Sequence, residues 1–205
     1  MKRLHRPEFH GWSRFDESRN VDFHSVLWKS SAGNLAVDPL PLSPHDEQHL
    51  GELGGAKLVI ITNSDHVRGA ARFSELTGAQ IAGPSAERAS FPITCDLWLK
   101  EGDQPLPGVS VLELSGSKTP GELALLIDDR KTRTLVTGDL VRAHQAGALN
   151  LLPDAKLSDR SAAVASLGRL AELDVDAVLV GDGWPVFRDG ARALRELLSS
   201  LKTAS

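Results

Sequence analysis

The stretch Leu58-Val59-Ile60-Ile61-Thr62-Asn63-Ser64-Asp65-His66 runs from an apolar, β-branched segment directly into a polar loop. Short apolar runs rich in β-branched residues are typical of buried strands, so Lys57–Thr62 is predicted to be one. A helix is predicted for residues 67–77, because Gly78 is a suitable C-terminal stop. A buried strand that ends in a loop with amide, carboxylate and imidazole groups indicates a ligand site.

Three further segments repeat this format, in which a buried strand runs into a polar loop. They are Leu114–Gly121, which includes Lys118, Leu135–Asp139, and Leu179–Gly183, which includes Asp182. Ligand sites in layered α/β proteins favour the loops at strand ends, so the four loops are expected to converge on one pocket.

The rest of the chain predicts an order of elements that requires two sheets. Strands are expected at residues 23–29, 34–37, 57–62, 79–82, 109–114, 123–127, 132–137 and 177–180. Helices are expected from Ser43-Pro44 to Gly54-Gly55, at 67–77, from Ser158 or Asp159 onward, and at 190–202. The polar residues Asp128–Lys131 would join two strands as an antiparallel hairpin, which excludes a single parallel sheet. Two sheets packed face to face with helices outside would satisfy this order, with residues 1–22 as an N-terminal arm or an edge strand.

The four loops resemble, in order, the motifs of the metallo-β-lactamase superfamily, which includes glyoxalase II. The family's His-x-His-x-Asp-His motif corresponds to Ile61–His66, and the Thr-Pro-Gly part of its Gly-His-Thr-Pro-Gly motif is kept in Lys118–Gly121. Thr137-Gly138-Asp139 matches the segment with the family's bridging aspartate. Gly181-Asp182-Gly183 stands where the family has Gly-His-Gly.

The resemblance extends to Gly33–Pro39, which is similar to the family's early strand ending in Asp-Pro. It covers roughly residues 23–202, nearly the whole chain. It implies an α/β (α+β) fold, the four-layer αββα sandwich of the metallo-β-lactamase type, as a single domain over residues 1–205.

The departures from the family's motifs fall on one of its two metal sites. In the family, the first metal is held by the two leading histidines and the histidine before Thr-Pro-Gly. Those positions are Ile61, Asn63 and Lys118 here. The second metal is held by the Asp-His pair, the bridging aspartate and the final histidine. The resemblance therefore implies a second-site ligand set of Asp65, His66, Asp139 and Asp182.

The charge of this ligand set requires a positive partner. Three carboxylates and one imidazole would carry about three negative charges if ionised. Burying them without a cation is far too unfavourable for a domain of this size. Either one divalent metal balances them (Zn, Mn or Fe, with Mg a further candidate), or Lys118 and an arginine do, or both act together. All three alternatives stay open at this point.

A site with a metal and a site without one imply different functions. With one metal, the chain would be a metal-dependent hydrolase that acts on an ester, thioester or phosphoester. Its catalytic residues would be Asp65, Lys118 as an oxyanion-stabilising ammonium, and Asn63 as a hydrogen-bond donor. Without a metal, the chain would be a non-catalytic binding or assembly module with a Lys–Asp cluster. Glutathione thioesters are disfavoured, because the chain ends soon after its last helix and lacks the glyoxalase II substrate domain.

Other candidate residues have a functional and a structural interpretation. Arg142 and His144 follow the bridging aspartate and could reach the pocket, and Trp184 could line it or lie in the core. Cys95 is expected to be a small core residue. Five further histidines could ligate a metal, but we interpret them as surface or packing residues. They are His5, His10 and His24 in the N-terminal region, and His45 and His49, which are four residues apart on a predicted helix.

The composition is typical of a globular protein and does not indicate a nucleic-acid or membrane partner. Of 205 residues, 41% are hydrophobic and 24% charged, and the net charge of −4 is mixed along the chain, so no nucleic-acid partner is expected. The longest apolar runs are too short to cross a membrane, and no apolar segment follows the basic N-terminus. We therefore expect a cytoplasmic protein with a small-molecule substrate, compatible with a homodimer.

Overall fold

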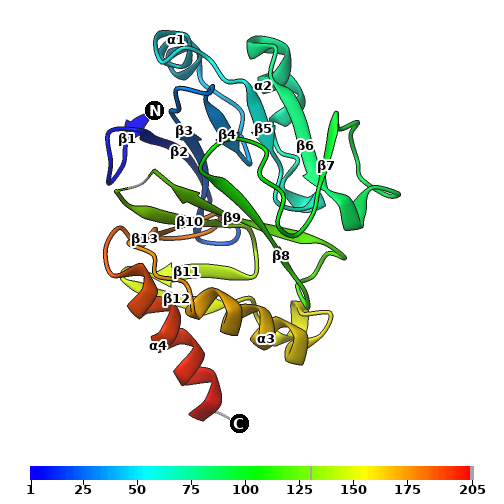
Figure 1. The fold of residues 1–205 in the computed structure, drawn as a ribbon, viewed down its shortest axis with the longest axis vertical. Helices are drawn as coiled ribbons and strands as arrows, with labels where there is room; N and C mark the ends of the chain where they lie inside the picture. Colours follow the sequence, from blue (N-terminus) through cyan, green and yellow to red (C-terminus); the bar gives the residue numbers. More distant parts are fainter. Residues whose placement is uncertain (130, 204–205) are drawn as a thin grey trace. The chain divides into compact units, whose positions relative to one another are not determined.

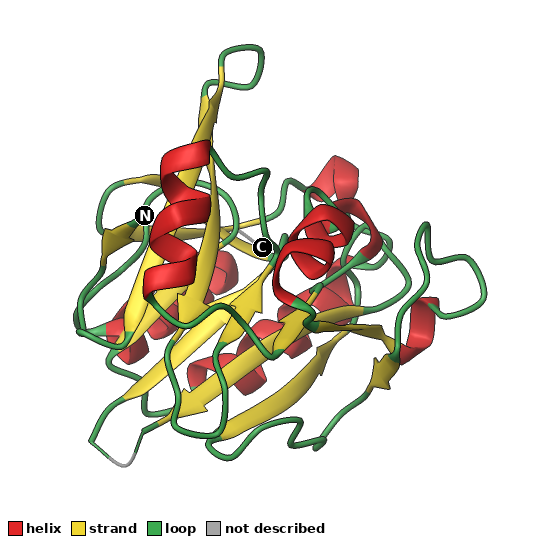
Figure 2. Ribbon diagram, turned by 90° about the horizontal axis from the view of Figure 1, so that it is seen from above, coloured by secondary structure: helices red, strands yellow, loops and turns green. Residues whose placement is uncertain are grey.

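The computed structural model describes residues 1–129 and 131–203 and contains two compact units, Met1–Leu99 and Lys100–Ser205. Each unit has its own sheet and helices, labelled in Figure 1 and coloured by element type in Figure 2. The single domain over residues 1–205 stays a prediction. Among the described residues, no helix has the length and apolar character needed to cross a membrane.

The first unit is built on a seven-stranded sheet in the order β1-β2-β3-β4-β5-β6-β7. Strands β1 to β4 pair antiparallel, and β4 to β7 pair parallel. Its elements are β1 (Lys2–Arg3), β2 (Phe9–Asp16), β3 (Val21–Trp28), β4 (Leu35–Val37), α1 (Pro44–Glu52), β5 (Leu58–Ile60), η1 (Ser64–His66), α2 (Ala70–Thr77), β6 (Gln80–Pro84), η2 (Ser85–Glu87) and β7 (Leu97–Leu99).

Helices α1 and α2 cover one face of this sheet. Leu50 of α1 and Phe73 of α2 pack in one buried cluster with Leu27 of β3, Val59 of β5 and Ile81 of β6. Burial of this apolar face stabilises the connections between the parallel strands. The loops at the carboxyl ends of β4 and β5 are thereby held in place.

The helix ends follow the predicted signals. Ser43 caps α1 by accepting a hydrogen bond from the Asp46 backbone N–H. In the second unit, Asp159 caps α3 (Arg160–Ala171) by accepting from the Ala162 backbone N–H. Gly78 ends α2 in a left-handed conformation, with φ of 71°.

The second unit contains a four-stranded sheet in the order β13-β10-β9-β8 and a separate hairpin of β11 and β12. Strands β10 and β13 pair parallel, and the other pairs are antiparallel. Its elements are β8 (Val109–Leu114), β9 (Glu122–Asp128), β10 (Arg133–Thr137), β11 (Val141–Gln145), β12 (Ala148–Leu151), η3 (Asp154–Lys156), α3 (Arg160–Ala171), β13 (Ala177–Val180) and α4 (Gly190–Thr203).

Helices α3 and α4 pack together beside the sheet and the β11–β12 hairpin (Figure 1). Leu167 of α3 and Leu194 of α4 belong to one buried cluster with Leu135 and Val178 of the central strands. The predicted antiparallel hairpin is confirmed in the pairing of β9 with β10. Its turn includes Arg130, which lies outside the described residues.

Three strands lie where none was expected. Strand β7 follows η2, and β11 and β12 form a hairpin directly after Asp139. Within residues 1–22, β1 lies at the edge of the seven-stranded sheet and β2 pairs along its full length with β3. The β11–β12 hairpin matters for the site, because it contains Arg142.

Candidate functional site

Lys118, Asp139 and Asp182 lie in loops at one edge of the four-stranded sheet. Strands β10 and β13 are parallel, and β9 is antiparallel to both β8 and β10, so β8, β10 and β13 all run in one direction. Their carboxyl ends therefore share an edge, and the three residues follow those ends. Three of the four loops that the sequence analysis singled out therefore lie at one end of this sheet.

Within this unit the two aspartates are paired with cations. Lys118 Nζ lies 2.9 Å from Asp139 Oδ2. The Arg142 guanidinium forms an ion pair with Asp182 and lies 4.0 Å from Asp139 Oδ1. Both aspartate side chains are 2% exposed, whereas Lys118 is 25% exposed. Two buried carboxylates are thus matched by two cations, which removes most of the penalty of burying them.

Glu122, at the start of β9, links the loops of Lys118 and Asp139. Its Oε2 accepts a hydrogen bond from Ser117 Oγ at 2.5 Å, and its Oε1 accepts one from the Leu140 backbone N–H at 2.8 Å. The Glu122 side chain is completely buried. Because Ser117 precedes Lys118 and Leu140 follows Asp139, this carboxylate fixes the backbone on both sides of the ion pair.

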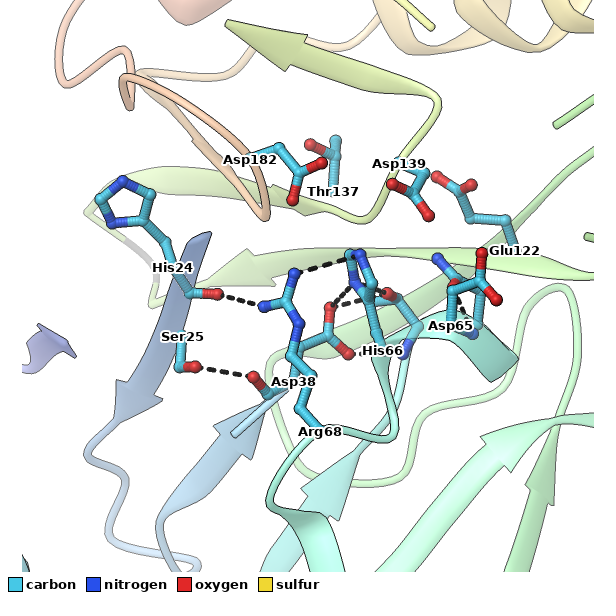
Figure 3. Close-up of polar contacts among 12 residues, drawn as sticks. His24, Ser25, Asp38, Asp65, His66, Arg68, Glu122, Thr137, Asp139 and Asp182 are labelled. Carbon is cyan, nitrogen blue, oxygen red and sulfur yellow. Dashed lines mark hydrogen bonds and ion pairs between the residues drawn. The ribbon is translucent and has the colours of Figure 1, made fainter. Parts of the chain in front are cut away.

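In the first unit, Asp38 organises the loop after β5 (Figure 3). Its Oδ1 accepts from the Thr62 backbone N–H and its Oδ2 from the Thr62 hydroxyl, each at 2.7 Å. Its Oδ2 also lies 2.7 Å from His66 Nδ1, and its carbonyl accepts from Ser25 Oγ at 2.7 Å. Asp38 is 2% exposed. The carboxylate therefore sets the orientation of the buried His66 ring.

The second nitrogen of His66 faces an arginine. Arg68 Nη2 lies 3.1 Å from His66 Nε2, and Arg68 Nη1 donates to the His24 carbonyl at 2.7 Å. A guanidinium has only donors, so Nε2 must be the acceptor and Nδ1 must carry the proton that it donates to Asp38. His66 is therefore neutral, because a protonated ring would place two donors against each other.

Two predicted site residues occupy different environments. Asn63 is buried, and its side-chain oxygen caps η1 by accepting from the Asp65 backbone N–H at 3.0 Å. The Asp65 side chain is exposed. The Ser64 N–H of the same turn donates to the buried Glu87 at 3.1 Å. Catalytic roles for Asn63 and Asp65, and metal ligation by Asp65, stay predictions.

The ligand-type side chains favour metal binding, whereas the cations beside them oppose it. His66, Asp139 and Asp182 are buried, and each offers an atom that ligates divalent metals. Each of them also has a cationic side chain of the protein beside a ligand atom. In the first unit, a divalent metal at His66 would have to displace Arg68 from Nε2. In the second unit, a metal at the two aspartates would meet Lys118 and Arg142. Within each unit, the residues as arranged do not fit an additional metal ion.

Sequence reasoning missed two of the residues that make these contacts. Asp38 was matched only to the family's early Asp-Pro strand, and no signal in the sequence marked Arg68. The structure places Arg68 at a φ of 43°, a left-handed conformation that favours glycine. An arginine held in this conformation indicates that its side-chain contacts outweigh some backbone strain.

The other candidates also have defined places. Trp184 is 57% exposed, so it is not a core residue. His144 is exposed, and partial burial together with the nearby Arg142 lowers its pKa below the usual 6.5. Cys95 is buried, which raises the pKa of its thiol to about 11. The His10 ring contacts the His49 ring edge-on, with 5.9 Å between centroids.

A sequence model of one family, described as the metallo-β-lactamase superfamily, matches residues 1–201. The chain belongs to the metallo-β-lactamase superfamily. Solved structures agree with this assignment. A metallo-β-lactamase from Pontibacter korlensis superposes with a TM-score of 0.71 at 18% identity, covering 95% of this chain and 94% of its own. The class B3 di-zinc metallo-β-lactamase LRA-12 from an Alaskan soil metagenome superposes with a TM-score of 0.63 at 16% identity. This match covers 95% of this chain and 92% of LRA-12. The predicted fold class is confirmed.

Among curated proteins, the chain is similar to a hydroxyacylglutathione hydrolase of Pseudomonas putida, at 40% identity over 96 residues. The match covers 45% of this chain and 35% of that protein. The chain therefore matches about a third of the length of this relative. The resemblance to glyoxalase II is confirmed, and members of the superfamily bind divalent metals, as the di-zinc enzyme shows.

Proposed function

We propose that this protein is a metal-free derivative of the superfamily's hydrolases that binds a small molecule without metal-dependent hydrolysis. The observation that carries this proposal is the pairing of Asp139 with Lys118 and of Asp182 with Arg142. Two of the four implied metal ligands are thus neutralised by side chains of the same unit. Arg68 occupies the acceptor nitrogen of a third, His66.

Electrostatics supports this proposal over simple decay of a metal site. Removing a metal from buried carboxylates leaves uncompensated negative charge, which is strongly unfavourable. Lys118 and Arg142 supply one positive charge for each of the two buried aspartates. The chain therefore contains the compensation that a site without metal requires.

A hydrolysis assay tests the proposal. The purified protein would be assayed on p-nitrophenyl acetate, a thioester and a phosphoester, with and without added Zn²⁺, Mn²⁺ or Fe²⁺. We expect rates no higher than those of the Asp139→Ala variant under every condition. A metal-stimulated rate that the Asp139→Ala variant lacks would overturn the proposal.

A one-metal hydrolase is the second candidate, and the contact of Asp38 with His66 favours it. A histidine whose Nδ1 donates to a carboxylate has the tautomer and orientation that metal ligands use. The ligands would be those that the resemblance implies, Asp65, His66, Asp139 and Asp182. A bound metal would supply an activated water for an ester, thioester or phosphoester. Lys118 would then stabilise developing negative charge.

A gain-of-metal variant separates the two candidates. The triple change Ile61→His, Asn63→His and Lys118→His restores the three imidazoles of the family's first site. If the native chain already binds one metal, the variant should bind about two. If the native chain binds no metal, the variant should bind at most one metal ion, at the restored first site.

A further inference from the structure

The connection between β6 and β7 in the first unit lines a cavity of about 540 Å³. Strand β7 is the outermost strand of the seven-stranded sheet (Figure 1). The apolar part of the cavity wall consists of Phe91, Pro92, Ile93 and Trp98, and all but Pro92 pack against the buried core of the unit. A concave and mostly apolar space of this size is typical of small-molecule sites. The proposed function does not explain this cavity, because no residue of its wall belongs to the implied metal-ligand set.

The wall of the cavity is held in place by hydrogen bonds and close packing. The Asp96 backbone N–H donates to the Ile81 carbonyl at 2.8 Å, and Asp96 Oδ2 accepts from the Ile81 N–H at 2.7 Å. The Phe91 ring lies on Gly83, where an added Cβ would come within 3.2 Å of Phe91 Cζ. The same ring meets the Trp98 ring edge-on, with 5.5 Å between centroids. A preorganised wall lowers the entropy lost when a ligand binds.

Arg88 brings a positive charge to the cavity. Its guanidinium carbon lies 5.8 Å from the centroid of the Trp98 ring, which is a cation–π contact. Arg88 lines the cavity and is exposed. In the part of the chain that the structure describes, no carboxylate pairs with Arg88. The guanidinium therefore has donors available for a ligand.

The described part of the cavity wall contains no carboxylate to oppose an anion. Glu87, the neighbour of Arg88, is 2% exposed and accepts from the Ser64 N–H at 3.1 Å, and it does not line the cavity. The other polar groups of the wall are the Thr94 hydroxyl and the Cys95 thiol, which are both neutral. A wall with one cation and no anion favours a negatively charged ligand.

We propose that this cavity binds a small carboxylate with an apolar body, which packs against Phe91 and Trp98 while the carboxylate pairs with Arg88. A guanidinium donates two parallel hydrogen bonds to a carboxylate, and burial of the apolar body adds affinity. One guanidinium balances the charge of a carboxylate but not the roughly two charges of a phosphate monoester. The Thr94 hydroxyl can donate a further hydrogen bond. This site goes beyond the proposed function and does not depend on it.

Isothermal titration with 4-phenylbutyrate tests the ligand class, with 4-phenylbutylamine as a cation of the same ring and chain length. We expect saturable binding of the carboxylate and binding of the amine that is weaker by about tenfold. Arg88→Met keeps an apolar stem but removes the charge, so it should weaken carboxylate binding about tenfold. Arg72→Met is the matched control, because it removes an exposed guanidinium of α2 that pairs with Glu75 and does not line the cavity. Its affinity for 4-phenylbutyrate should equal that of the native chain.

Thr94→Trp tests the location of the site. Thr94 is exposed at the cavity, so an indole there fills the space without entering the core. We expect this variant to lose saturable binding of 4-phenylbutyrate. Circular dichroism shows whether each variant folds, and Arg88→Met decides the question if Thr94→Trp does not fold.

Three results would overturn the proposal. They are the absence of saturable 4-phenylbutyrate binding to the native chain, equal or tighter binding of the amine, and native affinity in a folded Arg88→Met or Thr94→Trp variant. None of these results bears on metal content, so the inference can fail while the metal-free function stands.

Discussion

Lys118 Nζ lies 2.9 Å from Asp139 Oδ2, although residue 118 stands where the superfamily's Thr-Pro-Gly motif has a metal-binding histidine. A lysine cannot replace a metal ligand while it is protonated, but it can replace the charge of the metal. The relationship explains how a fold that is built around metal ions can keep a buried aspartate. It also makes the ion pairs, rather than the lost histidines, the features to test.

Replacing Lys118 should destabilise the protein. Lys118→Met removes the cation 2.9 Å from the buried Asp139 carboxylate, so we expect a loss of about 1–3 kcal/mol in the free energy of unfolding. The loss is moderated because Lys118 is partly exposed. Urea unfolding measures it, with Lys100→Met, an exposed lysine, as a control expected within about 0.5 kcal/mol of the native chain. A Lys118→Met variant as stable as that control would contradict the role given to the pair.

Replacing Arg142 should be more damaging. Arg142 is 7% exposed and pairs with the buried Asp182, so Arg142→Met would remove a buried cation that compensates this carboxylate. We expect a loss of about 3–5 kcal/mol. Arg192→Met removes a guanidinium that pairs with Asp189 and Glu196 on the surface, and it should change stability by less than about 1 kcal/mol. Similar losses in the two variants would show that the Arg142 pair is not special.

Arg68 allows a matched comparison between side-chain contacts and backbone strain. Arg68→Ala and Arg68→Gly both remove the contacts with His66 and the His24 carbonyl. Only glycine relieves the positive φ of 43°. We therefore expect the glycine variant to be more stable than the alanine variant by about 1 kcal/mol. Thermal unfolding of the pair measures this, and an alanine variant that is equally or more stable would contradict the strain.

His10 should make stability depend on pH. Burial, and then the nearby His49 and Lys29, lower its pKa below the usual 6.5. The unfolded chain therefore binds a proton at His10 at a higher pH than the folded chain does. The contribution of His10 is present above about pH 6.5 and is lost as the pH falls below that value.

The His10→Gln variant should lose less stability than the native chain between about pH 7.5 and about pH 5.5. His45→Gln changes an exposed histidine of α1 and should behave like the native chain. Urea unfolding at the two pH values measures the difference. Parallel losses in all three proteins would show that His10 does not contribute.

Local signals in the sequence predicted most elements. Apolar β-branched runs marked the buried strands, and the Ser43 cap and the Gly78 stop marked helix ends through local hydrogen bonds and backbone conformation. Strand β11 was missed because Arg142 interrupts its apolar pattern. That buried side chain pairs with Asp182, forty residues later, which no local pattern can show.

The sequence predicted part of the candidate site but not the contacts between its residues. Motif order identified Lys118, Asp139 and Asp182, because each follows a buried strand that ends at one edge of a sheet. The cations that face His66 and Asp182 were not predictable as partners. No signal in the sequence marks Arg68. The position of Arg142 after the bridging aspartate places it near the pocket, but only the tertiary structure shows that it pairs with Asp182.

The metal content of the purified protein tests the central claim most directly. The protein would be produced with Zn²⁺, Mn²⁺ and Fe²⁺ supplied and analysed by inductively coupled plasma mass spectrometry, beside the Arg142→Ala variant. We predict less than about 0.1 metal ions per native chain, and a higher content in the variant, where the Asp182 carboxylate has lost its internal cation. About one metal ion per native chain, lost in the Asp139→Ala variant, would contradict the account.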